Sequence, residues 1–397
     1  MKTIHQGSAK FFRNLRFLVL GLLAFYALWL TFSIAGYKKW EAGSPADDSS
    51  PPFREIRGVY HIHTKFSDGL ANLSKVAGVA KSLGLDFIVV SDHGSPNRQS
   101  LASEGWTAGV LCLTGSELST SRGHLVALGF TPPQQRFPQN ADLAARAVTG
   151  RGGFSIIAHP FNKTHWSWGE WAGYSGLEII DADTMIKKNA IPTLPYLPSL
   201  FLRPGLYLLK ILDPPARTTR KWDELNESHQ VAGYFSADAH FLYRAAFSLF
   251  RLHVLLEKPL SAEFGTAKGQ VFDALRTGSF YNSIEAAACA SGFRFWAEKD
   301  GTTYPMGSVF SSRDIGPAAT AGAPLTLKVN ARYPFAIELR FIYNGKMIFS
   351  TKNQESSLIP LQPGAYRVEV FLREKTPLRP DIPWIVSNPI FIRKDGP

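Results

Sequence analysis

Short apolar segments that end in metal-binding residue types recur through residues 57–284, and they constrain the fold more than any other feature of this 397-residue chain. Segments rich in Val, Ile, Leu and Phe alternate with stretches of helical periodicity. Strands this apolar are covered on both faces, as in a parallel sheet or a barrel with helices outside. We therefore predict an α/β barrel. After a first strand ending in GVYHIH, its strands are FIVVSDH (87–93), VLCLTGSE (110–117), HLVALGF (124–130), FSIIAH (154–159), LEIIDA (177–182) and VAGYFSADAH (231–240).

The pattern changes after residue 284. Residues 285–397 contain strand-like segments separated by Gly, Pro and Asn turns, with no convincing helix between them. A length of about 110 residues and this number of strands are typical of a small antiparallel β-sandwich. Its His, Asp and Glu residues form no recognisable cluster, so we predict a packing or partner-binding domain.

A twenty-residue run without a charge, Phe17 to Gly36, is long enough for a helix to cross a membrane. We predict that residues 1–40 contain a transmembrane anchor and that 41–56 are a linker. More basic residues precede the run than follow it, which favours a cytoplasmic N-terminus and a catalytic domain outside the cytoplasm. A cleaved signal peptide is the alternative, because Ser33-Ile34-Ala35 resembles a cleavage site. The basic residues are Lys2, Lys10, Arg13 and Arg16 before the run and Lys38 and Lys39 after it.

The formal charge of +11 is concentrated in two places. Residues 1–40 carry +6 and residues 185–222 carry another +6, which leaves −1 for the rest. A basic face extending over a whole domain is therefore absent, and no nucleic-acid partner is expected. The apolar and basic insertion 185–222 is predicted to be a lid over the barrel mouth, with contact to the membrane surface as the alternative.

Six of the ten histidines and several carboxylates lie at or beside the ends of the predicted strands. Side chains at the carboxyl ends of barrel strands converge on one mouth. So many imidazoles and carboxylates would be costly to bring together without cations, and divalent metals favour such N and O ligands. The candidate metal ligands are His61, His63, Asp68, His93, Glu117, His124, His159, Asp238 and His240.

Different features of the sequence support the individual candidate ligands. His61 and His63 are two residues apart on a strand, so their rings are expected to point to the same side. Glu117 ends an otherwise apolar strand, where a buried carboxylate needs a partner. Asp68 lies in an SDG sequence, for which a simple turn is the alternative explanation.

The motifs HIHTKFSDG, VVSDHGS, GSE, GHLVALGF, IIAHPF, GLEIIDA and SADAH, in this order, resemble those of the polymerase and histidinol phosphatase (PHP) superfamily of metal-dependent phosphoesterases. The resemblance covers residues 60–284 and implies a distorted (β/α)7 barrel. The downstream GSFYNSIEA and PWIVSNPIFIR are similar to the carbaryl-hydrolase-like branch.

The resemblance implies two or three divalent ions, with Zn, Mn or Fe as candidates. One departure is Val59, which stands where the family often has an Asp, so an orienting contact at His61 is absent. The implied ligand sets are His61, His63, Glu117 and Asp238 for a first ion, Glu117, His124 and His159 for a second, and Asp68, His93 and His240 for a third.

The implied activity is hydrolysis of phosphate mono- or diesters by water activated on these metals. Glu117, Asp238 and His240 are the expected catalytic residues. Lys163 and Arg244 are candidate contacts for the substrate anion. Asp92 and Asp181 are candidates for orienting imidazoles, with strand-end or helix-capping roles as alternatives. The alternative functions are hydrolysis of carboxylic or carbamic esters, and a non-catalytic metal-binding envelope protein. The oligomeric state is left open.

Overall fold

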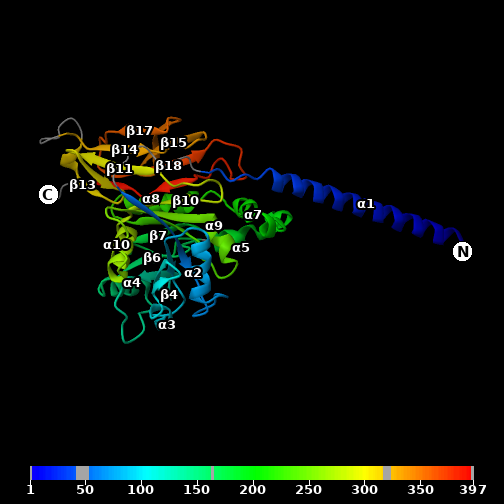
Figure 1. The fold of residues 1–397 in the computed structure, drawn as a ribbon, viewed down its shortest axis with the longest axis horizontal. Helices are drawn as coiled ribbons and strands as arrows, with labels where there is room; N and C mark the ends of the chain where they lie inside the picture. The colour runs from blue at the N-terminus through cyan, green and yellow to red at the C-terminus, as the bar shows by residue number, and fades with distance from the viewer. Residues whose placement is uncertain (1, 42–52, 162–164, 316–322, 395–397) are drawn as a thin grey trace.

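The computed structural model describes residues 2–41, 53–161, 165–315 and 323–394. Within them the protein is a mixed α/β structure with one 16-stranded sheet, a second sheet of four strands, and a long apolar helix at the N-terminus (Figure 1). The mixed α/β class predicted from the sequence is confirmed.

The large sheet joins most strands of the chain. Its main path is β13 (Val309–Ser311), β20 (Ile390–Arg393), β18 (Gly364–Leu372), β19 (Ile385–Ser387), β10 (Phe280–Ile284), β9 (Phe250–Leu256), β1 (Arg54–Ile62), β2 (Phe87–Val90), β4 (Val110–Ser119), β5 (His124–Leu128), β6 (Phe154–Ile157), β7 (Gly176–Asp181) and β8 (Ala232–Ser236). Three strands pair beside this path: β3 (Gly105–Thr107), β15 (Ile337–Tyr343) and β16 (Lys346–Thr351). The second sheet runs β12 (Thr302–Pro305), β11 (Arg294–Lys299), β14 (Thr326–Asn330) and β17 (Glu355–Leu358).

Strand directions differ from a purely parallel arrangement. β1, β2 and β4 are parallel neighbours, as are β6, β7 and β8, but β5 runs antiparallel to both β4 and β6. β5 is therefore reversed relative to both of its neighbours. The connection from β4 to β5 spans only four residues, Thr120 to Gly123, and is too short for a parallel crossover.

Hydrogen bonds connect the segment after β8 back to β1. The Ala237 amide donates to the Tyr60 carbonyl at 3.1 Å, the Ala239 amide to the His61 carbonyl at 3.2 Å, and the His63 amide to the Ala239 carbonyl at 3.0 Å. These bonds bring β1, β2, β4, β5, β6, β7 and β8 into a continuous circuit of neighbours. The seven-stranded barrel stays a prediction, and these hydrogen bonds support it.

Short helices cover the strands where the sequence has helical periodicity. Gly84, at φ +67°, follows the end of α2, a position where glycine is common. Asn72 and Asn140 cap α2 and α4 by accepting backbone hydrogen bonds. The helices of this part are α2 (Leu73–Ser82), α3 (Arg98–Leu101), α4 (Ala141–Thr149), α8 (Ala216–Asn226), α9 (Tyr243–Leu249) and α10 (Phe264–Thr277).

The insertion 185–222 forms a compact group of helices. It comprises most of α5 (Ala182–Thr193), the 3-10 helix η1 (Leu194–Tyr196), α6 (Ser199–Leu202), α7 (Pro204–Lys210) and the first part of α8. Tyr207, Leu208 and Leu209 of α7 are buried in the largest hydrophobic core. In Figure 1 the group lies on the side of the molecule from which α1 (Lys2–Ala35) departs.

The predicted boundary at residue 284 falls inside this continuous sheet. β10 before the boundary pairs with β19 after it, and one hydrophobic core contains residues from both sides, such as Trp222 and Val368. The domain limits and the β-sandwich remain predictions. A second 3-10 helix, η2 (Ser312–Asp314), lies in the C-terminal part.

The N-terminal helix α1 contains the 25-residue segment Phe11–Ala35, in which an 18-residue window has a mean hydropathy of 2.2 and no buried residue. By length and composition it could cross a membrane, and it projects away from the folded body (Figure 1). The predicted orientation across the membrane stays a prediction.

A buried ion network links β1 to β9 and to the segment after β10. His253 Nδ1 lies 2.8 Å from Glu55 Oε1, and its Nε2 lies 3.7 Å from Glu285 Oε2. Burial raises the pKa of both carboxyl groups, but His253 and nearby cations, including Arg294 beside Glu55, outweigh it and hold both pKa values at about 2.

Stability is expected to fall as the pH drops from about 4.5 towards 2, because Glu55 is more acidic in the folded state than in the unfolded chain. The contribution of Glu55 is fully present above its unfolded pKa and is on the order of 3 kcal/mol. Unfolding free energies measured across this range should depend less on pH in Glu55→Gln than in the wild type. Glu257→Gln, at an exposed position, should keep the wild-type slope. Equal slopes in all three proteins would contradict the assignment.

Candidate metal centre

All nine residues predicted as metal ligands lie together at one edge of the strands. His124 starts β5 and still lies at this edge, because β5 is reversed and Ser119 at the end of β4 pairs with it. The others come from the end of β1 (His61, His63), the loop after it (Asp68), the segment after β2 (His93), the end of β4 (Glu117), and the segments after β6 (His159) and β8 (Asp238, His240).

Glu117 is the central group of the cluster. Its side chain is 1% exposed. Oε1 lies 2.8 Å from His124 Nδ1 and 3.1 Å from His159 Nε2. Oε2 lies 3.2–3.3 Å from ring nitrogens of His61, His63 and His93. Burial raises the pKa of Glu117, but the surrounding imidazoles lower it well below its ordinary value, so it is a carboxylate.

His61, His63 and Asp238 approach one another beside Glu117. The two Nε2 atoms are 3.1 Å apart, and Asp238 Oδ1 lies 3.4 Å from His61 Nε2 and 3.1 Å from His63 Nε2. Burial lowers the pKa of His61, but the carboxylates of Glu178, Asp238 and Glu117 raise it well above its ordinary value.

The backbone at three candidate ligands has positive φ: +66° at His61, +40° at Asp238 and +28° at His159. Such conformations cost on the order of 1–3 kcal/mol in non-glycine residues and concentrate at functional sites. At His61 the pairing register with β2 is also irregular. The His61 and His63 rings therefore converge because the end of β1 is distorted. The regular alternation of side chains along a strand does not explain their positions.

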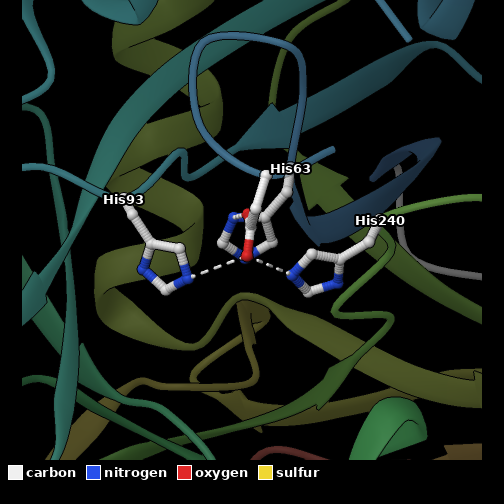
Figure 2. A group of neighbouring side chains, drawn as sticks. His63, His93 and His240 are labelled. Carbon is white, nitrogen blue, oxygen red and sulfur yellow. Dashed lines mark ion pairs between the residues drawn. The ribbon is translucent and has the colours of Figure 1, made fainter. Parts of the chain in front are cut away.

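A third group lies nearer to solvent. Asp68 Oδ1 is 3.4 Å from His63 Nδ1, and its Oδ2 is 3.6 Å from His93 Nε2 and 3.3 Å from His240 Nε2. Figure 2 shows the rings of His63, His93 and His240 directed towards one point. The geometry thus adds His63 to the predicted set of Asp68, His93 and His240.

Sequence reasoning missed Glu178. This buried residue of β7 places Oε1 2.6 Å from His61 Nδ1 and accepts a hydrogen bond from the His159 amide at 2.7 Å through Oε2. It supplies the orienting contact to His61 that was expected to be absent because of Val59. The signal in the sequence was a lone glutamate within the apolar run GLEIID.

Glu178→Gln is expected to reduce metal affinity or turnover by about 10- to 100-fold, because carboxylates that orient metal-bound imidazoles have effects of this size. Glutamine keeps the shape of the side chain and removes its charge. Metal titration and kinetics of the variant would test this, with Glu257→Gln as the matched control. Unchanged metal affinity and turnover would exclude the orienting role.

The two aspartates proposed to orient imidazoles have other contacts. Asp92 accepts hydrogen bonds from the Thr64 amide and from the hydroxyls of Thr64, Ser67 and Ser100, so it fixes the loop after β1. Asp181 caps α5 through the Thr184 amide, which was the capping alternative. Burial, with the carboxylates of Asp238 and Glu178, raises the pKa of Asp181 to about 7.

The two candidate substrate contacts fare differently. Lys163 lies outside the described residues. Arg244 lies on α9 and donates to the Ser82 hydroxyl at 2.9 Å at the surface. Among the described residues, no hydrogen bond or ion pair joins Arg244 to the metal-binding cluster. Its role stays a prediction without support from a contact.

Basic groups that the sequence analysis did not select lie beside the cluster. A cavity of about 300 Å³ is bounded by His159 and Glu178 on one side and by Lys188 and Arg217 of the insertion on the other. Lys188 Nζ lies 2.7 Å from Asp213, and the Arg217 guanidinium lies 4.2 Å from the centre of the Phe161 ring. The concentration of basic residues at 185–222 is the feature of the sequence that could have identified Lys188 and Arg217.

The residues fit divalent metal ions. The donors are imidazole nitrogens and carboxylate oxygens, which suit Zn, Mn and Fe, and Glu117 is shared between groups. Asp238 Oδ1 is buried beside the ring nitrogens of His61 and His63, at 3.4 and 3.1 Å, but neither contact has the geometry of a hydrogen bond. A buried carboxylate oxygen in this state is costly unless a cation binds it.

Comparisons with known proteins gave distant similarities. No protein family model matches the chain. The uncharacterized protein MJ1587 of Methanocaldococcus jannaschii is 25% identical over 124 residues, which cover 27% of this chain and 69% of that protein.

Solved structures are also similar at low identity. A two-domain protein from Bacteroides vulgatus, described as containing a predicted PHP-like metal-dependent phosphoesterase, has a TM-score of 0.41 and 14% identity, covering 89% of this chain and 99% of its own. An amidohydrolase from Chromobacterium violaceum, with bound sulfate and no metal, has a TM-score of 0.31 and 14% identity over 46% of this chain and 87% of its own. At this distance, any assignment of activity rests on the side chains of the cluster.

Proposed function

We propose that the protein is a membrane-anchored, metal-dependent hydrolase that cleaves phosphate mono- or diesters. One observation carries the proposal: the two oxygens of Glu117 face different sets of histidines, so that one carboxylate joins neighbouring metal-binding groups. Structural metal sites are closed by their own four ligands, whereas adjacent sites that share a carboxylate leave positions for water and substrate.

Bound divalent ions would lower the pKa of coordinated water and neutralise charge on the phosphate oxygens. In the reaction, water adds to phosphorus, the P–O bond to the leaving alcohol breaks, and the alcohol departs with a proton. Lys188 and Arg217 beside the cluster are placed to attract the phosphate anion.

His240 is suited to accept a proton or to hold a cation. Its Nδ1 lies 2.9 Å from the Asp238 carbonyl oxygen, which can only accept, so Nδ1 carries the hydrogen. In the neutral ring the lone pair is then on Nε2, which faces Asp68 at 3.3 Å. The carboxylate of Glu178 fixes the His61 ring in the same way, because its Oε1 accepts a hydrogen bond from His61 Nδ1.

We place the chain in the PHP superfamily with a seven-stranded barrel, for which the motif order and the hydrogen bonds between the segment after β8 and the end of β1 are the support. The carbaryl-hydrolase-like branch is proposed on sequence resemblance, and the C-terminal β-sandwich on the length and strand content of residues 285–397. Anchoring by α1, with the enzyme body outside the cytoplasm, rests on the apolar segment Phe11–Ala35.

The test is a substrate panel with the full chain, purified without chelator and supplied with Mn or Zn. We expect turnover of p-nitrophenyl phosphate or bis-p-nitrophenyl phosphate and its loss after chelation. Turnover of naphthyl esters alone would favour carboxylic ester hydrolysis, and metal binding without any turnover would favour a non-catalytic protein. Cell fractionation should find the chain in the membrane, with its body digested by protease added from outside the cytoplasm.

A further inference from the structure

A cavity of about 240 Å³ extends from the metal centre into the insertion. Asp238 and His240 form part of its wall. Most of the remaining wall is apolar and comes from α5, α6, α7 and α9, with Ile186, Leu200 and Leu208 among the lining residues. A small, fully polar phosphate ester would leave this apolar space beside the metal ligands unfilled.

The outer surface of the same insertion is unusually apolar. Ile191 is 85% exposed, Phe201 75% and Leu202 67%, and Leu194 and Leu197 are exposed beside them. Five large apolar side chains within twelve residues make a patch of a kind that soluble proteins rarely leave in contact with water. Leu197 belongs to both features, because it also lines the cavity.

Contacts hold this apolar patch against the apolar helix α1. The Tyr26 hydroxyl donates to the Pro195 carbonyl at 2.8 Å, and the Trp29 and Tyr196 rings are 4.9 Å apart. Tyr26 lies nine residues and Trp29 six residues before Ala35, the end of the apolar segment. At 1.5 Å per residue they are about 9–14 Å from that end, so residues bound to them reach the depth of a lipid leaflet if α1 crosses the bilayer.

Basic residues flank the patch, as expected for a segment that meets anionic headgroups. Lys187 precedes it, and Arg203 and Lys210 follow it. In Figure 1 α7 lies near the end of α1 that joins the folded body, and α6 contacts α1.

We infer that the substrate is an amphiphilic phosphoester drawn from the bilayer, whose alkyl chain occupies the cavity between α5, α6, α7 and α9 while its phosphate lies at the metal centre. This inference rests on the proposed function. It names the substrate class and assigns the insertion the role of a lipid-contacting wall of the site.

The experiment uses alkyl p-nitrophenyl phosphates with methyl, butyl and octyl chains, kept below their aggregation concentrations. Water adds to phosphorus and p-nitrophenolate leaves in every case, so the chemistry is constant and only the chain varies. We expect kcat/KM to rise about tenfold or more from the methyl to the octyl ester, because each methylene transferred out of water is favourable. In Leu200→Asp the octyl-to-methyl ratio should fall towards one. Leu361→Asp, at an exposed leucine of the C-terminal part, should keep the wild-type ratio.

The source of the substrate is tested with the full chain in vesicles of phosphatidylcholine and phosphatidylglycerol. Hexadecyl p-nitrophenyl phosphate should be hydrolysed when it is embedded in the same vesicles as the protein and not when it is in separate ones.

The outcomes separate the inference from the proposed function. Hydrolysis of the methyl ester with no dependence on chain length, or a chain-length effect that persists in Leu200→Asp, overturns the inference and leaves the hydrolase intact. Hydrolysis of soluble esters without hydrolysis of the embedded one overturns the bilayer source. Failure to hydrolyse any ester, with metal bound, overturns the proposed function.

Discussion

Glu117→Gln is expected to lower turnover on the order of a thousandfold, an effect comparable to removing a group that stabilises charge in a transition state, and to lower the number of bound metal ions. The carboxylate serves His124 and His159 through one oxygen and His61, His63 and His93 through the other. An amide keeps one oxygen and replaces the other with an NH2 group, which cannot bind a cation. Whichever way the amide turns, one set of histidines loses its shared ligand.

Metal content per chain, kcat/KM and thermal unfolding should be measured together on this variant. Glu257→Gln is the control for purification and handling, because Glu257 is exposed. A folded Glu117→Gln protein with the full complement of metal and wild-type turnover would remove the basis of the proposed function.

Arg367→Met is expected to reduce the free energy of unfolding by about 3–5 kcal/mol, the range for breaking a buried ion pair from one side. Arg367 of β18 is buried and forms two hydrogen bonds to Asp223 of α8, each 2.9 Å long, and a third to Glu369. Burial lowers the pKa of Arg367, but the two carboxylates outweigh it, so the guanidinium is charged. The variant leaves both carboxylates without their cation.

This pair also joins the two parts that the sequence predicts as separate domains. Denaturant unfolding should show one transition in the wild type, since α8 and β18 share both the ion pair and a core. Adding Asp223→Leu should recover part of the loss, because the second variant removes one of the stranded charges. Replacing the exposed Arg379 should change stability by less than about 0.5 kcal/mol. If Arg367→Met also lowered the free energy of unfolding by less than about 0.5 kcal/mol, the buried ion pair would contribute little to stability.

The convergence of the candidate ligands was predictable because strand ends are local features. Apolar runs ending in His or Glu indicate where each strand stops, and the carboxyl ends of neighbouring parallel strands meet at one edge. His124 was selected on the same basis although its strand is reversed. It lies at the correct edge because a reversed strand begins where its neighbours end.

The orienting groups were harder to predict. Glu178 reaches His61 across 117 positions of sequence, and no local pattern distinguishes its role from that of Asp92, which instead fixes a loop. Arg244 is close in sequence to His240 but is bonded to Ser82 at the surface. Proximity in sequence does not determine which way a long side chain turns.

From the amino-acid order alone follow the mixed α/β class, the apolar N-terminal helix and the identity of the candidate ligands, since each depends on periodicity or composition within a short stretch. The tertiary structure was needed to establish the reversal of β5, the cavity joining the cluster to the insertion, and the continuity of the sheet past residue 284. These features depend on contacts between distant segments, and the packing of the whole chain fixes them.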